Sequence, residues 1–520
     1  MNKKVIVCDI DIVRKKGISY FQDNYFWPVS EHEYKDFVNF STETYNSLLL
    51  DCKDNKVFDI MLQEYQFVDT IQKILHYNYV KNYSHEHEFT MLYGDQTKSL
   101  FFPDWEKFSS VFFKTTTRYT EFILFIKRIL KNIIFNKFKF FLKKVLKPAS
   151  ELNFALCIGS MSDLKKTYIY DNEIYCDHKY WNHIINSKIK VDNELDLNKY
   201  SFVSSYLDAL KSRNDLFVKG VDFRGIEKTW LKRLSEISSV YDHLLTIEKP
   251  KTLLVTDQAN PAHKIITIAF QRSGVDVVCF SHGNNLAVLN QTIIHQFVIS
   301  HLKKYVVPNE TIKKNYEYIY SVLPIEKKTG TRYLSLNIPN INQYNNCQKK
   351  QRTFEKTKIM LIGFPANTNR LTDTAGDFSL FKIDLEYRII LKLKSLGYFV
   401  QYKAHPDRLD EISGIFNQLV DEYISERFEN VINNTDLIVF THAATTTFGY
   451  TLASNQPIVM INVKGNPWNE LTYDALTKRV HMVPAILNNG IRIEFDQNYF
   501  AEKIKVAIDS KYKYVANLGV

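Results

Sequence analysis

Three features that would classify a protein quickly are missing from this sequence. Its six cysteines (Cys8, Cys52, Cys157, Cys176, Cys279 and Cys347) form no C-x-x-C pair, which argues against a zinc ribbon or a disulfide framework. Neither G-x-G-x-x-G nor G-x-x-x-x-G-K-[ST] occurs, so dinucleotide and P-loop chemistry have no support. No apolar run reaches the roughly 18 residues that a bilayer-spanning helix needs.

The first residues, "MNKKVIVCDIDIV", also fail as a secretion signal, because Asp9 and Asp11 interrupt a short apolar run. Together with the isolated cysteines, this favours a reducing compartment. We therefore expect a cytoplasmic protein that is soluble or peripheral on the inner face of the cytoplasmic membrane.

A length of 520 residues predicts at least two domains, and a net charge of +10 suits anionic partners. Nucleotides, phosphate groups and an acidic membrane face all fit this charge. We expect no nucleic-acid partner.

The middle of the chain alternates strand and helix patterns. The segments are "FALCIGS", a helix over 226–247, "KTLLVTD", a helix over 261–273 and "VDVVCFSHGNN". This rhythm predicts a parallel sheet covered on both faces, within an N-terminal domain over residues 1–325.

A polar segment over 326–356 is the predicted linker, and a second β-α-β series follows over 357–520. Its elements are "TKIMLIGFP", helices near 383–396, 409–423 and 445–454, and the strands "YFVQYKAHP", "DLIVF" and "PIVMINV". The predicted fold class is α/β with two Rossmann-like domains facing a cleft, a helical insertion in the N-terminal half and a terminal helix.

A basic helical segment is predicted at about 110–148. From Lys114 to Lys147 there are ten Lys or Arg residues and one acid, Glu121. A helical hairpin with solvated basic faces is the favoured interpretation. A docking face for anionic lipid is the alternative.

Polar residues gather where the strands of the second series end. They are Gly363 and Pro365 after the first strand, Lys403, His405 and Pro406 after the second, and Thr445, Thr446 and Thr447 beyond the third. Hydroxyls and free N–H groups at the start of a helix favour an anion, so we expect a phosphate here. Simple helix capping by the threonines, and an ordinary strand-end histidine, are the structural alternatives.

Two of these segments carry a resemblance. "KAHP" and "DLIVFTHAATTTFGYTLASNQPIVMI" resemble the nucleotide-binding half of bacterial GT-B glycosyltransferases that use CMP-activated acidic sugars, the sialyl- and Kdo-transferases of capsule and lipopolysaccharide assembly. On that resemblance His405 and Pro406, and Thr445 with Thr446 or Thr447, contact the CMP. "TDQANPAHKIITIAFQRSGVDVVCFSHGNN" is similar to a region of surface-carbohydrate enzymes.

The resemblance implies a CMP-sugar donor and a glycan or glycolipid acceptor. The acidic-acidic-Gly triplet of the sialyltransferases is missing, and "KGVDFRGIE" around Asp222 has its elements in another order, so the retaining β-Kdo transferases fit better. CMP leaves as a monophosphate, which imidazolium, hydroxyls and N–H groups stabilise, so no metal or other cofactor is required. Asp9-Ile10-Asp11 is the rival signal, for a metal-dependent transferase or an aspartyl phosphatase.

Asp257 and His282 are the predicted catalytic residues. Both follow apolar strands in consecutive β-α-β units, so they are expected at one edge of the sheet. An aspartate there attacks or stabilises an oxocarbenium-like centre, and an imidazole relays a proton or binds the sugar carboxylate. The structural alternatives are an N-cap for the helix after Pro261 and a turn residue before Gly283.

Two other functions stay open. Through its His-Gly and His-Pro segments and an expected basic, membrane-facing surface, the chain also resembles the CDP-polyol phosphotransferases of teichoic-acid type. A non-catalytic binding protein of capsule assembly is the third hypothesis.

Overall fold

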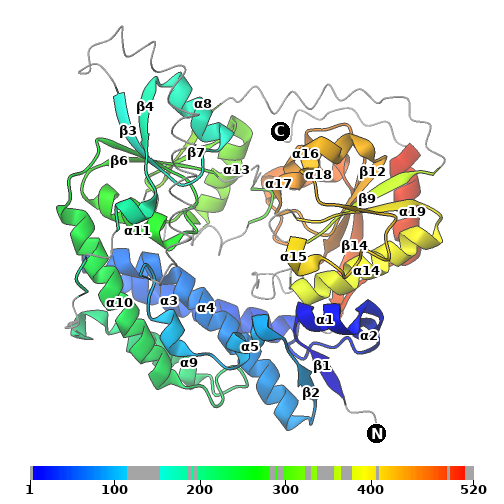
Figure 1. Cartoon of the computed structure of the whole chain (residues 1–520), viewed down its shortest axis with the longest axis horizontal. Coiled ribbons are helices and arrows are strands. Elements are labelled where there is room, and N and C mark those ends of the chain that lie inside the picture. The colour runs from blue at the N-terminus through cyan, green and yellow to red at the C-terminus, as the bar shows by residue number, and fades with distance from the viewer. Residues whose placement is uncertain are drawn as a thin grey trace.

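The computed structural model describes residues 4–113, 153–185, 189–191, 197–281, 287–290, 298–322, 330–336, 356–364, 378–405, 409–488 and 492–509. Two bodies, each built on a sheet, lie side by side, and a mainly helical unit from the first 113 residues runs beneath both in the view of Figure 1. The predicted class, α/β with two Rossmann-like domains, is confirmed.

In the described part of the N-terminal half, a six-stranded parallel sheet has the order β4-β3-β5-β6-β7-β8. Its strands are β3 (Asn153–Ile158), β4 (Ile174–His178), β5 (Thr252–Val255), β6 (Asp276–Phe280), β7 (Lys304–Val307) and β8 (Arg332–Ser335). Helix α8 (Asp163–Asp171) covers one face and α11 (Pro261–Arg272) the other. Both faces are buried, which explains the near-continuous apolar strands.

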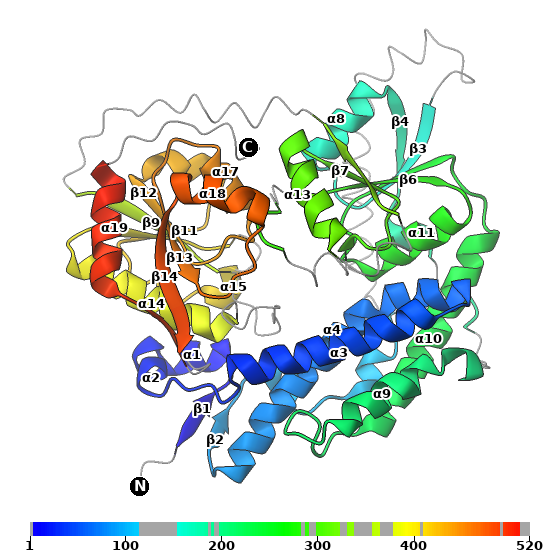
Figure 2. The same ribbon diagram turned by 180° about the vertical axis from the view of Figure 1, so that it is seen from behind.

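The helical unit comprises α1 (Ile10–Lys16), α2 (Ile18–Asp23), α3 (Glu31–Asp51), α4 (Asn55–Glu86) and α5 (Asp95–Phe101), with β1 (Val5–Val7) paired to β2 (Thr90–Leu92). Figure 2 shows α3 and α4 alongside α9 (Phe202–Ser212) and α10 (Phe223–Thr246), which they contact. The region 1–325 therefore holds a helical unit as well as its sheet.

The expected opening strand is shorter than "KVIVCDIDIV". It ends at Val7, because the Asp9 side chain accepts a hydrogen bond from Asp11 N and caps α1. Helix α1 and the segment after α2 contact the C-terminal half. Arg14 Nε donates to Ser413 O at 3.0 Å, and the rings of Trp27 and Phe378 lie 4.7 Å apart. The first part of the chain therefore contacts both bodies.

In the described C-terminal half, a seven-stranded sheet has the order β11-β10-β9-β12-β13-β14-β15. The strands are β9 (Lys358–Ile362), β10 (Phe399–Lys403), β11 (Glu422–Ile424), β12 (Leu437–Phe440), β13 (Ile458–Val463), β14 (His481–Asn488) and the antiparallel β15 (Arg492–Phe495). The first six strands have the spatial order of dinucleotide-binding domains. In that order, the chain proceeds in one direction across the sheet from β9 to β11 and in the other direction from β12 onwards.

The helices of this half are α14 (Ser379–Ser395), α15 (Leu409–Ile412), α16 (Phe428–Val431), α17 (Thr446–Leu452), α18 (Glu470–Arg479) and α19 (Gln497–Asp509). The helix predicted near 409–423 is wrong beyond Ile412. Gly414 takes a φ of 82°, which ends helical geometry, and residues 422–424 pair with β10 as an edge strand.

The predicted linker also contains structure. Residues 332–335 form β8, which pairs with β7, so the first part of the 326–356 segment belongs to the N-terminal sheet. Tyr333 explains the difference: it is buried and stacks on Tyr316 of α13 (Glu310–Ser321), with ring centroids 5.8 Å apart. One buried aromatic stabilises a strand whose neighbours are polar.

The two halves meet through loops that follow strand ends. Leu289, beyond β6, forms an antiparallel bridge with Trp468, beyond β13. Asn469 N donates to Val288 O at 2.8 Å, and the Asn469 side-chain nitrogen donates to Ala287 O at 3.1 Å. Loops from the carboxyl ends of both sheets therefore contact each other.

The basic segment at about 110–148 lies, beyond residue 113, outside the described residues. Within the described part of the chain, none of the helices has the length and apolar character to cross a bilayer.

Candidate active site

The carboxyl ends of β3 and β5 form the first candidate site. The chain order of the N-terminal sheet reverses here, because β4 flanks β3 on one side and β5 on the other. Such a switch point is where α/β sheets bind ligands. Gly159 and Ser160 follow β3, and Thr256 and Asp257 follow β5.

Asp257 is held in a defined orientation. Its Oδ2 accepts a hydrogen bond from Ser160 N at 2.8 Å, and its Oδ1 lies 3.3 Å from Ser160 Oγ. Its φ is +61°, a left-handed conformation that costs a non-glycine residue roughly 1 kcal/mol or more. The N-cap of α11 is Asn260, which accepts from Ala262 N at 2.9 Å. The capping alternative for Asp257 is therefore wrong.

Two basic side chains, Lys165 and His263, lie close enough to Asp257 to interact with its charge. Lys165 is buried and donates to Ile158 O at 2.8 Å, and burial lowers its pKa while the Asp257 carboxylate opposes that change. His263 Nδ1 lies 3.2 Å from Thr256 O, so Nδ1 is the donor. Burial also lowers the pKa of His263. Sequence reasoning missed both residues, which occupy ordinary helix positions.

The partner predicted for Asp257 cannot be placed, since His282 lies outside the described residues. Strands β5 and β6 are parallel neighbours, as expected for the strands that precede the two residues. Asp222, the reserve candidate, is the N-cap of α10 and accepts from Gly225 N at 2.9 Å. Its side chain thus has a structural role.

The carboxyl ends of β9 and β12 form the second candidate site, at the switch point of the C-terminal sheet. Gly363 follows β9, and a Cβ there would lie 2.3 Å from the hydroxyl oxygen of Tyr402, so only glycine fits. The rings of Phe364, which follows β9, and His442, which follows β12, meet edge to face with their centroids 4.9 Å apart.

The predicted phosphate ligands around β10 have different surroundings. Lys403 is buried, its Nζ donates to Ala404 O, and burial lowers its pKa. His405 is half-buried and lies two residues beyond the end of β10. Pro365 and Pro406 lie outside the described residues. Of the two described residues, Lys403 and His405, His405 is therefore better placed to contact a ligand.

The three threonines stand at the start of α17, as predicted. Thr445 is its N-cap and accepts from Thr447 N at 3.3 Å, so capping is one of its roles. The helix has only seven residues. Its far end is held by the buried Arg479, which donates to the carbonyl oxygens of Thr451, Ser454 and Gln456 at 3.2, 2.8 and 2.8 Å.

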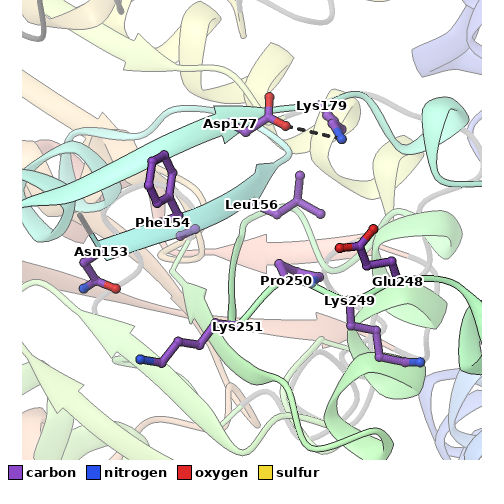
Figure 3. A pocket seen from close by; sticks show the side chains of 10 residues that line it. Asn153, Phe154, Leu156, Asp177, Lys179, Glu248, Lys249, Pro250 and Lys251 are labelled. Atoms are coloured by element: carbon purple, nitrogen blue, oxygen red, sulfur yellow. Dashed lines mark ion pairs between the residues drawn. The ribbon is translucent and has the colours of Figure 1, made fainter. Parts of the chain in front are cut away.

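A cavity of about 910 Å³ lies elsewhere, along the first half of β3 (Figure 3). Its lining residues are Asn153, Phe154, Ala155, Leu156, Asp177, Lys179, Glu248, Lys249, Pro250 and Lys251. Asp177 and Lys179 pair at 3.3 Å. None of the predicted site residues lines this cavity.

The rival Asp9-Ile10-Asp11 signal has a structural explanation. Asp9 is buried, and its Oδ2 accepts from Thr97 Oγ1 at 2.6 Å and from Gly94 N at 3.1 Å. Asp11 pairs with Arg14 at 2.5 Å. Among the described residues, no group of three or more His, Cys, Asp or Glu side chains could hold a metal ion. Independence from metal stays a prediction.

No family model matches the sequence, and no curated protein does either. Several solved chains are similar, among them the following two. One is the Methanocaldococcus jannaschii UDP-GlcNAc 2-epimerase in complex with UDP-GlcNAc and UDP, with 12% identity, a TM-score of 0.39, and 71% of this chain and 96% of that one covered. The other is the Streptomyces sp. SF2575 glycosyltransferase SsfS6 with thymidine diphosphate, with 10% identity, a TM-score of 0.30, and coverages of 71% and 94%. At these scores the likeness carries no argument about function.

Proposed function

We propose that this chain is a glycosyltransferase of GT-B type, which moves an acidic sugar from a CMP donor to a surface glycan acceptor. The donor nucleotide binds the C-terminal half, the acceptor binds the N-terminal half, and Asp257 acts between them. Kdo or a related ulosonic acid is the proposed sugar. A lipopolysaccharide or capsule precursor at the inner membrane face is the proposed acceptor.

One observation supports this proposal most: Asp257 stands at a switch point, with a left-handed backbone and a carboxylate oriented by Ser160. Non-glycine residues in this conformation cluster at active sites, where surrounding contacts fix them. The second switch point has the strand order of nucleotide-binding domains and lies in the other half. The loop contact between Leu289 and Trp468 brings the two strand-end edges together.

In the proposed reaction, the bond between the anomeric carbon and the phosphate oxygen breaks and CMP leaves with the electron pair. The Asp257 carboxylate forms a bond to the anomeric carbon. An acceptor hydroxyl then displaces the carboxylate and passes its proton to the imidazole of His282, the proposed proton relay. His405 and hydroxyls of Thr445 to Thr447 stabilise the departing phosphate, with no metal.

The donor is tested by incubating the purified protein with CMP-Kdo and, separately, with CDP-glycerol, each with a lipid-linked glycan acceptor. Release of CMP with transfer of Kdo supports the proposal. Transfer of glycerol phosphate instead identifies the polyol phosphotransferase. If neither donor turns over but CMP binds, a non-catalytic binding protein is favoured.

Replacing His405 by alanine should weaken CMP binding about tenfold or more, because a charge-assisted hydrogen bond to phosphate contributes roughly 1.5–3 kcal/mol. Calorimetry measures the affinity and circular dichroism checks the fold. His85→Ala, an exposed histidine in the helical unit, is the control and should leave affinity unchanged. Equal affinity of His405→Ala and wild type would remove His405 from the site.

A further inference from the structure

Glu386 lies on α14 directly beneath the C-terminal switch point, and none of the steps above uses it. It is buried, with its side chain facing the sheet one helical turn from the buried Lys382. Acidic residues in a helix interior are rarely fully buried unless they have partners. The contacts of this carboxylate therefore indicate its role.

The Glu386 carboxylate connects three strand ends. Its Oε1 accepts from Phe364 N, the second residue after β9, at 2.7 Å, and lies 3.4 Å from Thr441 Oγ1, directly after β12. Its Oε2 accepts from the Tyr402 hydroxyl on β10 at 2.9 Å. This hydroxyl is the atom that excludes a side chain at Gly363. One side chain thus fixes the backbone on both sides of the switch point.

The other polar groups near Glu386 reinforce the same two loops. Lys382 Nζ donates to Thr441 O at 2.5 Å and lies 5.6 Å from the centre of the Phe364 ring. His442 also contacts that ring, edge to face. Among the residues that the structure describes, the titratable groups that face Glu386 are thus Lys382 and Tyr402, with His442 one ring away.

Burial raises the pKa of Glu386 to about 7, and the hydrogen bonds from Phe364 N and Tyr402 only partly oppose it. Near neutral pH the side chain therefore exists in both protonation states. Either state can accept the Phe364 N–H bond, because a protonated carboxyl keeps a carbonyl oxygen. The two states differ in charge. A negative ligand above the loops repels only the ionised one.

We propose that Glu386 is a positioning residue that holds the ends of β9 and β12, and that it takes up a proton when a phosphate-bearing ligand binds above them. This inference rests on the proposed nucleotide site in the C-terminal half. Two like unit charges about 8 Å apart at an effective dielectric of about 20 repel strongly enough to move a proton equilibrium by about one unit or more.

The proton uptake is tested by calorimetry with CMP between pH 7 and pH 9, where the phosphate is already a dianion. A rise of about one unit in the pKa of Glu386 on binding predicts that wild-type affinity falls about fivefold over this range. Glu386→Gln keeps the hydrogen-bonding shape without the charge, so its affinity should fall about fivefold less than that of wild type and keep only the part of the fall that comes from His405 losing its proton. Glu236→Gln is the matched control: Glu236 is buried on α10 and accepts from Val111 N at 2.9 Å, in the other half.

An equal fall with pH in wild type and Glu386→Gln would overturn the proton uptake and leave the nucleotide site intact. An absence of CMP binding at every pH would instead overturn the proposed function, and the proton uptake with it. Positioning is measured separately, by hydrogen exchange of the peptides that contain 362–364 and 440–442. Glu386→Ala should lose protection there and Glu386→Gln should keep it. Unchanged protection in Glu386→Ala would overturn the positioning role.

Discussion

Asp257→Asn should reduce sugar transfer by about 10²–10⁴-fold or more, because the amide can neither attack the anomeric carbon nor act as a general base, and a general base alone contributes a factor of about this size. Asparagine tolerates a positive φ, so the backbone at +61° is preserved. Its amide also fits the Ser160 contacts, because the amide oxygen accepts from Ser160 N. CMP affinity should stay within about twofold, since the nucleotide site lies in the other half.

Asp276→Asn is the matched control for this experiment. Asp276 lies at the opposite end of the same sheet, where it is exposed and pairs with Lys304 at 2.5 Å. This surface ion pair contributes about 1 kcal/mol or less, so turnover should be normal. With CMP-Kdo, mass spectrometry of wild type should find one sugar on the peptide containing Asp257. Full turnover by Asp257→Asn would exclude both the nucleophile and the base roles.

The sequence was a good guide to the sheets, because buried parallel strands are apolar throughout. "KTLLVTD" and "DLIVF" correspond to β5 and β12, and the helix predicted at 261–273 is α11. It was a poor guide where a distant contact decides the structure. Residues 422–424 form a strand only because β10 lies beside them, and Tyr333 is buried only against Tyr316. Neither contact can be predicted from the sequence pattern around the residues concerned, because the partners are distant in the chain.

The same contrast between local sequence pattern and distant contact applies to the candidate sites. Asp257 could be proposed from its place after an apolar strand, since strand ends gather at one edge of a parallel sheet. Ser160 and Lys165 could not, because their contacts with that edge cross between separate elements. Glu386 resembles a solvated helix residue in sequence. Only the packing of α14 under β9 and β12 shows that it is buried.

The space around Asp257 provides the second test with a large expected effect. Gly159 has a φ of +79°, and a Cβ there would lie 2.5 Å from Thr256 Oγ1 and 2.8 Å from Thr256 O. Because Thr256 O is backbone, it cannot turn away as a flexible side chain would. Gly159→Ala should therefore displace the Asp257 loop and lower turnover about a hundredfold, since a misplacement of about 1 Å has an effect of this size.

Gly274→Ala separates this clash from the cost of the backbone conformation. Gly274 has a φ of +83° in the same half, but no atom lies within 4 Å of the position of its Cβ. Both variants should lose roughly 1 kcal/mol in free energy of unfolding from the positive φ, as measured by urea titration. Only Gly159→Ala should also lose turnover, with CMP affinity preserved. Equal turnover in the two variants would show that the Asp257 loop tolerates displacement, which a residue that attacks the anomeric carbon does not.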